Sequence, residues 1–221
     1  GSFAIFGEFG LLAGVDDFSL RGAVNAQGEP ATILDAEGDG RLLGIDFGQT
    51  RATEIENIAF INGERLSGGG AVGISNGSDP LFRNCRFDDS RTEQNGGAVL
   101  VTNASATFLD CSFTANQTAI PGAGGAIHVV DGTIEVRNCR FDSNRSEGGG
   151  AIGFEDSTGN EMIDSIFTGN EADRGGAIYL QQSELTVSRS DFTLNTGTLA
   201  GSAIDVWISQ LEIMDVLVCS N

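Results

Sequence analysis

The stretch of sequence that decides the fold runs from 124 to 144 and reads GGAIHVVDGTIEVRNCRFDSN. Residues 133–137 alternate polar and apolar side chains, and in 127–130 the apolar Ile127 and Val129 alternate with His128 and Val130, which is the period-two pattern of a β-strand with one buried face. The Asp-Gly pair at 131–132 separates these two segments and is typical of a turn. A third short apolar segment follows at 139–141. This stretch therefore predicts three short strands within one unit.

Two strings of this unit recur in alternation along the chain. Gly-Gly-Ala followed by Val or Ile begins at the positions Gly69, Gly96, Gly124, Gly149 and Gly175, with a variant at Gly201. Phe-x-x-Asn begins at Phe113, Phe141, Phe167 and Phe192, with degenerate copies at Phe60, Phe87 and Val218. Successive Phe residues from Phe60 to Phe192 are 27, 26, 28, 26 and 25 residues apart. A period of about 26 residues with three strands predicts an all-β parallel solenoid with one repeat per coil.

Stacking the repeats places equivalent residues in columns. One column is aromatic and is predicted to form a buried structural ladder: Phe60, Phe87, Phe113, Phe141, Phe167 and Phe192. A second column interrupts the alternation between the second and third strands: Asn57, Asn84, Asp110, Asn138, Asp164 and Asp215, with Arg189 in the same row. Because Asn and Asp tolerate a left-handed backbone, this second column predicts a tight bend in every coil.

The N-terminal part of the chain is less regular. We expect residues 1–30 to form an N-terminal cap and an irregular first coil, with a short helix within 1–17. Residues 31–221 are expected to form the repeated solenoid. Phe18 and Leu20, together with the apolar segments 32–34 and 42–45, resemble the strands of one earlier coil.

Composition excludes several classes of function. The chain has 221 residues and a formal net charge of −19, and all twelve basic residues are arginines. A protein this acidic has no basic stripe with which to bind nucleic acid or an anionic membrane surface. No apolar run approaches the roughly 18 residues of a membrane span, so we expect no direct insertion into a membrane. Absence of lysine with an excess of acid suits a high-salt, marine or extracellular setting.

The alternating Gly-Gly-Ala-Ile and Phe-x-x-Asn strings resemble the repeats of the polymorphic membrane proteins of chlamydiae. The resemblance covers residues 57–221. It implies a right-handed parallel β-helix with three strands per coil, as in the passenger of a surface autotransporter. It further implies an extracellular or cell-surface location and a structural or adhesive role, with a host or cell-surface receptor as partner. No catalytic residues come with this resemblance.

One outer face of the predicted solenoid carries the candidate ligand-binding residues. The single His, Tyr and Trp of the chain, together with two acids, fall on outward positions of the first strand: His128, Glu155, Tyr179, Asp205 and Trp207. Aromatic and acidic side chains on a flat strand array are suited to holding a glycan. The alternative is that these are scattered surface residues beneath neighbouring loops.

A carbohydrate-active enzyme on this same face is the rival hypothesis. Such an enzyme needs a cleft, and the loops at 144–148, 170–175 and 181–183 are short. Glu155 and Asp205 could form an acid pair, but they lie two coils apart. We therefore expect no catalysis.

Three cysteines share an inward column. Cys85, Cys111 and Cys139 follow one another in successive coils, and serines continue the column at 165 and 190. Metal or redox chemistry is one interpretation. The simpler one is that cysteine fills a small apolar space beside the Phe column. Side chains in register point the same way, which is poor geometry for a disulfide. Cys219 lies outside the column and is expected to be a free thiol.

We expect no resident metal or cofactor. Asp35, Glu37 and Asp39 loosely match a Ca²⁺ loop, but an acidic turn between strands explains the same residues. Four Asn-x-Ser/Thr sequons begin at Asn76, Asn103, Asn116 and Asn144.

The last core positions of the repeat are expected to be covered in the functional protein. The final apolar layer would consist of Ile204, Val206, Leu211, Ile213 and Val218. Solenoid ends need a cover because an open coil presents unpaired strand edges. The remainder of a longer surface protein, or neighbouring copies stacked head to tail, could supply it.

Overall fold

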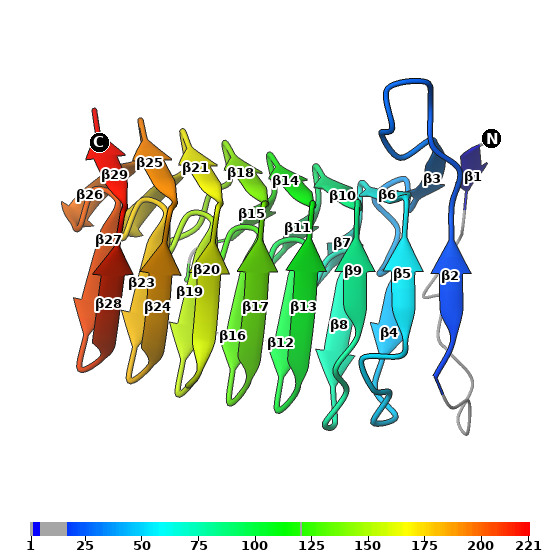
Figure 1. Ribbon diagram of the computed structural model, residues 1–221, viewed down its shortest axis with the longest axis horizontal. Coiled ribbons are helices and arrows are strands. Elements are labelled where there is room, and N and C mark those ends of the chain that lie inside the picture. The colour runs from blue at the N-terminus through cyan, green and yellow to red at the C-terminus, as the bar shows by residue number, and fades with distance from the viewer. Residues whose placement is uncertain (1, 5–16, 120) are drawn as a thin grey trace.

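The protein is a rod of stacked β-coils. The computed structural model describes residues 2–4, 17–119 and 121–221, and within these residues it contains strands and no α-helix. The coils follow one another along the long axis, with three long parallel sheets running the length of the rod (Figure 1). All pairings between the named strands are parallel. The predicted all-β parallel solenoid is confirmed.

Each long sheet collects one strand from every coil. The first-strand sheet has seven strands: β4 (Leu43–Ile45), β8 (Val72–Ser75), β12 (Val99–Thr102), β16 (Ile127–Val130), β19 (Ile152–Glu155), β23 (Ile178–Gln181) and β27 (Ile204–Trp207). The second-strand sheet has eight: β2 (Ser19–Arg21), β5 (Glu54–Glu56), β9 (Leu81–Arg83), β13 (Ser105–Leu109), β17 (Thr133–Arg137), β20 (Asn160–Ile163), β24 (Glu184–Ser188) and β28 (Gln210–Met214). The third-strand sheet has nine: β1 (Ser2–Ala4), β3 (Thr32–Asp35), β6 (Ile58–Ile61), β10 (Arg86–Asp88), β14 (Ser112–Thr114), β18 (Arg140–Asp142), β21 (Ile166–Thr168), β25 (Asp191–Thr193) and β29 (Leu217–Cys219).

The return segment of each coil is more ordered than the short loop that the sequence predicts. It contains a fourth strand in several coils, and these strands pair in two small sheets: β7 (Glu64–Arg65), β11 (Arg91–Thr92) and β15 (Gln117–Thr118), then β22 (Glu171–Arg174) and β26 (Thr196–Ala200). These segments contain few apolar residues and show no regular alternation of apolar and polar side chains, so their pairing follows from the stacking of the coils and not from local sequence.

The aromatic column is buried as predicted. Phe87 pairs in register with Phe60 and Phe113, and the six side chains of the column are fully buried. Ring centroids of Phe113 and Phe141 are 4.7 Å apart with an interplanar angle of 1°, and the next two pairs are equally parallel. Neighbouring rings therefore stack at the strand spacing of the sheet. A second stack, between Phe82 and Phe108, was not predicted.

The bend column also behaves as predicted. Its seven residues, Asn57, Asn84, Asp110, Asn138, Asp164, Arg189 and Asp215, all have φ between 47° and 59°. Side chains of adjacent coils bond along the column: Asn138 Nδ2 donates to Asp110 Oδ1 over 2.6 Å. Arg189 fits this row through two contacts to Asp164, and it holds the pKa of that carboxyl below its usual value.

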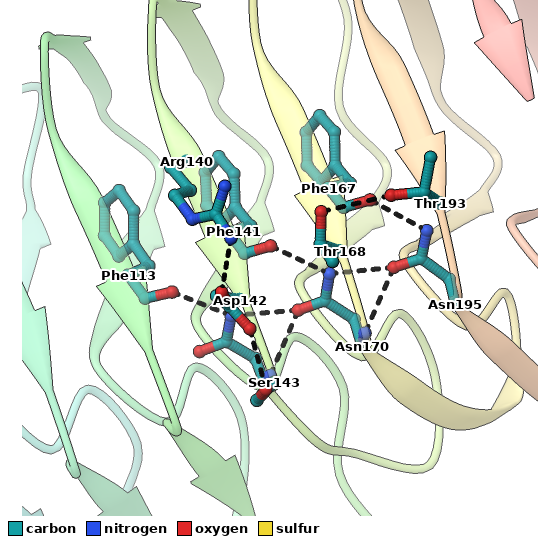
Figure 2. A network of polar contacts seen from close by, with 11 residues as sticks. Phe113, Arg140, Phe141, Asp142, Ser143, Phe167, Thr168, Asn170, Thr193 and Asn195 are labelled. Carbon is teal, nitrogen blue, oxygen red and sulfur yellow. Dashed lines mark hydrogen bonds and ion pairs between the residues drawn. The ribbon is translucent and has the colours of Figure 1, made fainter.

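The Asn of the Phe-x-x-Asn string forms an internal ladder that sequence reasoning missed (Figure 2). Asn170 Nδ2 donates to the carbonyl of Phe141 and to Asn195 Oδ1, and Asn170 Oδ1 accepts from the backbone N–H and the side chain of Asn144. Asn116 continues the same pattern, and Asn116, Asn144, Asn170 and Asn195 are fully buried. The sequons at Asn116 and Asn144 are therefore inaccessible in the folded protein.

The N-terminal end of the rod begins with an irregular coil. Part of the predicted N-terminal cap, including the expected helix, falls on residues 1 and 5–16, which lie outside the described residues. Strands β2, β3 and β4 form the predicted earlier coil, and Phe18 and Leu20 pack against the core.

At the C-terminal end of the rod, the inward positions of the last coil are partly exposed to solvent. Val206, Ile213 and Val218 are 40%, 49% and 52% exposed.

Truncating the aromatic column should destabilise the protein strongly. We expect Phe141→Ala to lower the free energy of unfolding by about 3–5 kcal/mol, the usual cost of a buried Phe truncation. Leu199 is 77% exposed, so Leu199→Ala should change stability by less than about 0.5 kcal/mol. Urea unfolding of both variants measures the difference. A loss below about 1 kcal/mol for Phe141→Ala would contradict the observed stack.

Breaking the asparagine ladder should cost about as much despite the smaller side chain. Asn170→Ala leaves buried partners in two neighbouring coils without hydrogen bonds, and each orphaned group costs about 1–3 kcal/mol. We therefore expect a loss of about 3 kcal/mol or more in urea unfolding. Asn221→Ala is the matched control, because Asn221 is an exposed member of the same ladder and water can replace its bonds. Equal losses in the two variants would refute the ladder's role.

Candidate functional site

The outer face of the first-strand sheet carries a concave site. It is an open pocket of about 380 Å³ lined by Asn95, Pro121, Gly122, Ala123, His128, Glu147, Gly148, Glu155, Arg174, Tyr179 and Gln181. The floor comes from strands β16, β19 and β23, and the rim comes from the segments that precede the Gly-Gly turns. Strand side chains alternate between core and outer face, so the sheet itself aims His128, Glu155, Tyr179 and Gln181 outward.

Backbone hydrogen bonds between coils hold the rim in place. The carbonyl of Gly122 accepts from the backbone N–H of Glu147 over 3.0 Å, and the carbonyl of Glu147 accepts from that of Arg174 over 3.0 Å. Asn95 Oδ1 accepts from the backbone N–H of Ala123 over 2.8 Å. Four successive coils are thus linked at the rim, which makes the site a preformed part of the rod.

His128 forms the buried floor of the site. It lies on the outer face as predicted, yet it is only 2% exposed, which its sequence position did not indicate. A Cβ on Gly153, its register partner, would lie 2.8 Å from His128 Nδ1 and 3.0 Å from the Ala123 Cβ. A side chain at 153 would therefore collide with both residues, and glycine there gives the imidazole its space.

The imidazole of His128 lacks a hydrogen-bond partner on either ring nitrogen among the described residues. The carboxylate of Glu155 faces the ring, with its Oε2 3.7 Å from Nε2. His128 holds the pKa of the Glu155 carboxyl below its usual value, so Glu155 is an anion at neutral pH. Its side chain remains 42% exposed at the pocket mouth.

Tyr179 and Arg174 complete the wall opposite His128. The Tyr179 ring lies over Gly148, because a Cβ there would be 3.1 Å from Tyr179 Cδ1, and its hydroxyl donates to Gln181 Oε1 over 3.3 Å. Arg174 Nε lies 4.0 Å from Asp205 Oδ2. Arg174 and Glu147 were not predicted as site residues, because they lie in return segments that only the stacking of coils brings to the sheet.

The five predicted ligand-binding residues are only partly brought together. His128, Glu155 and Tyr179 line the pocket. Asp205 does not line it, but contacts the lining residue Arg174. Trp207 is in register with Gln181 but does not line the pocket, and it is 45% exposed on the last coil. The pocket also corrects the expectation that short loops leave no concavity, because inter-coil hydrogen bonds raise even short segments into a rim.

The other candidate sites are explained by structure. Cys85, Cys111 and Cys139 are buried, and each Sγ lies 3.4–3.6 Å from a backbone carbonyl of an adjacent coil. Burial raises the pKa of the Cys111 thiol well above its ordinary value, which makes it unreactive. These three cysteines and Cys219 are free thiols, and Cys219 is exposed as expected.

The predicted acidic turn is held by hydrogen bonds. Asp35 Oδ1 accepts from the backbone N–H of Glu37 and from Asn62 Nδ2. Across the described residues, no group of three or more His, Cys, Asp or Glu side chains is arranged to hold a metal ion. Ca²⁺ at Asp35, Glu37 and Asp39 stays a prediction that no observation here supports.

The fold and the repeat place the chain in a known class of proteins. The family described as right handed beta helix region matches residues 23–203, so the chain belongs to the right-handed β-helix family. Among curated proteins, it is similar to two from Dictyostelium discoideum. It is 32% identical over 126 residues to metabotropic glutamate receptor-like protein R, and 36% identical over 163 residues to metabotropic glutamate receptor-like protein Q.

These similarities cover 55% and 58% of this chain but only 8% and 14% of the two relatives. The chain therefore spans a small part of the length of the proteins it resembles. No solved structure shows a significant match to it.

Proposed function

We propose that the chain is an extracellular or cell-surface β-helix module with a structural or adhesive role, working as part of a longer surface protein. The observation that carries this proposal is the unbroken stack of coils, in which every long sheet keeps its register from the first described coil to the last. A stack of this kind is a stiff spacer that displays its side faces.

Composition and similarity support the surface location. A net charge of −19 without lysine suits an extracellular setting, and both curated relatives are named as receptor-like proteins. The repeat strings resemble those of chlamydial surface autotransporters, which have adhesive roles. The described residues include no helix of the length and apolarity needed to span a membrane.

We propose that the module is not catalytic. Glu155 and Asp205, the acid pair considered from the sequence, do not face each other. Glu155 contacts His128, and Asp205 contacts Arg174. The lowered pKa of Glu155 makes it a poor general acid at neutral pH. Glycan binding along the first-strand face is the alternative function. The ring of Tyr179 at the pocket supports glycan binding, and the ion-pair contacts of Glu155 and Asp205 disfavour a glycan enzyme.

The edge of β27, β28 and β29 is the proposed site of continuation. Its apolar end is lined by Ala203, Ile204, Leu211, Ile213 and Val218, and no further strand pairs with it among the described residues. A further coil of similar geometry, from the same protein or from a second copy, would cover these side chains and pair the free backbone groups. Head-to-tail contact of this type builds a filament and not a closed dimer.

The exposed end should make the isolated chain associate. Light scattering at increasing concentration is expected to show open-ended growth, which Ile213→Asp reduces by placing a charge in the apolar end. Leu66→Asp is the control, because Leu66 is 67% exposed in an early coil and the change in charge is identical. A chain that stays monomeric at every concentration would contradict head-to-tail stacking at this edge.

The surface location and the lack of catalysis can be tested together on the natural protein. An antibody raised against the chain should label intact cells of the source organism, and external protease should remove that label. The purified chain should release no products from uronate or neutral polysaccharides. Labelling only after permeabilisation would refute the location. Turnover that is lost in Glu155→Gln would refute the absence of catalysis.

A further inference from the structure

We propose that the pocket at His128 binds a primary ammonium group, carried by a lysine side chain of a partner protein or by a free amine. The site lies on the side of the rod and not at its open end, so it stands apart from the module role proposed above. Three features of the pocket support this ligand: the unpartnered imidazole, the charges around it and the aromatic wall.

The buried imidazole points to a polar ligand. A neutral histidine offers one acceptor and one donor nitrogen, and leaving such groups buried without hydrogen bonds is unfavourable. Both nitrogens of His128 are in this condition, and the residue lines the pocket. A ligand atom that donates a hydrogen bond could engage the acceptor nitrogen while it also contacts Glu155, 3.7 Å from Nε2.

Charge decides which donor fits best. Glu147 and Glu155 line the pocket, whereas the positive charge of Arg174 is faced by Asp205 at 4.0 Å. No ion pair or hydrogen bond engages the side chain of Glu147 among the described residues. The local balance is therefore negative, and the net charge of −19 adds a field that attracts cations and repels anions.

Geometry favours an ammonium group over a bare metal ion. The acids and His128 do not form a group of three arranged to hold a metal, within the part of the chain that the structure describes. Tyr179 adds an aromatic ring to the wall, and a cation close to such a ring gains a further attraction. An ammonium donates up to three hydrogen bonds, so it can bond to Glu155 and His128, whose Oε2 and Nε2 atoms lie 3.7 Å apart, while Glu147 adds negative charge at the rim.

The composition of the chain adds a separate argument about the source of the ligand. There is no lysine among its 221 residues, so a copy of this chain offers no side-chain ammonium to the pocket. A lysine-bearing partner would reach a recess whose rim is already fixed by inter-coil hydrogen bonds, with little ordering cost.

The experiment uses the single histidine and the single tyrosine as reporters. NMR signals of the His128 and Tyr179 rings are unique in this chain, so they can be followed while n-butylamine is added at pH well above neutral. We expect saturable shifts with n-butylamine and none with n-butanol, butyrate, methyl glucoside or calcium chloride. Higher salt should weaken the amine binding, because the attraction is electrostatic.

Two variants test whether the local carboxylate is responsible. Glu155→Gln should weaken n-butylamine binding by about tenfold, since hydrogen bonds to charged groups are the stronger class. Glu171→Gln makes the same change of charge at an exposed carboxylate that faces Arg145, 3.5 Å away and outside the pocket. It should change the affinity by less than about twofold.

Two further ligands distinguish the two possible sources of the ammonium group. Tighter binding of Nα-acetyl-lysine methylamide than of putrescine would indicate a lysine of a partner protein, and the reverse order would indicate a free polyamine. Equal shifts with n-butanol, or shifts with methyl glucoside or calcium instead of the amine, would overturn the proposal. Absence of shifts with n-butylamine, or equal losses in both Glu variants, would do so as well.

Discussion

Each residue of the rod must lie beside its own equivalent in the next coil, and the structure depends on this constraint. Parallel strands in register bring like side chains to within about 4.8 Å of each other. Inward positions can therefore hold only residues that tolerate their own kind as neighbours. Phenylalanine meets this condition because parallel rings stack, as Phe113 and Phe141 do at 4.7 Å. A charged residue does not, because a buried column of like charges would repel itself.

Asparagine meets the same constraint with hydrogen bonds. Its amide carries both a donor and an acceptor, so Asn144 and Asn170 bond to each other and to the backbone, and the ladder needs no other type of side chain. Serine and cysteine in the neighbouring column satisfy their polar atoms against carbonyls. The core is thus polar and apolar in separate columns, and both kinds tie one coil to the next.

The pocket arises where the repetition is broken. Row neighbours of His128 on the outer face are Leu100 and Gly153, and the next residue in that row is Tyr179. The glycine gives room for the imidazole, and the tyrosine closes the far side. A regular row of identical side chains would leave a flat ribbon. The irregular residues are therefore the ones that give this face its shape and charge.

The sequence by itself determined the solenoid, the Phe60 to Phe192 column and the left-handed bends at Asn57 to Asp215, because each follows from short-range periodicity repeated many times. It also placed His128, Glu155 and Tyr179 on one face. Only the tertiary structure decided that His128 is buried, that Arg174 and Glu147 join it, and that Trp207 does not. Those outcomes depend on how return segments of separate coils bond across the sheet, and on the space left by Gly153, which no local pattern records.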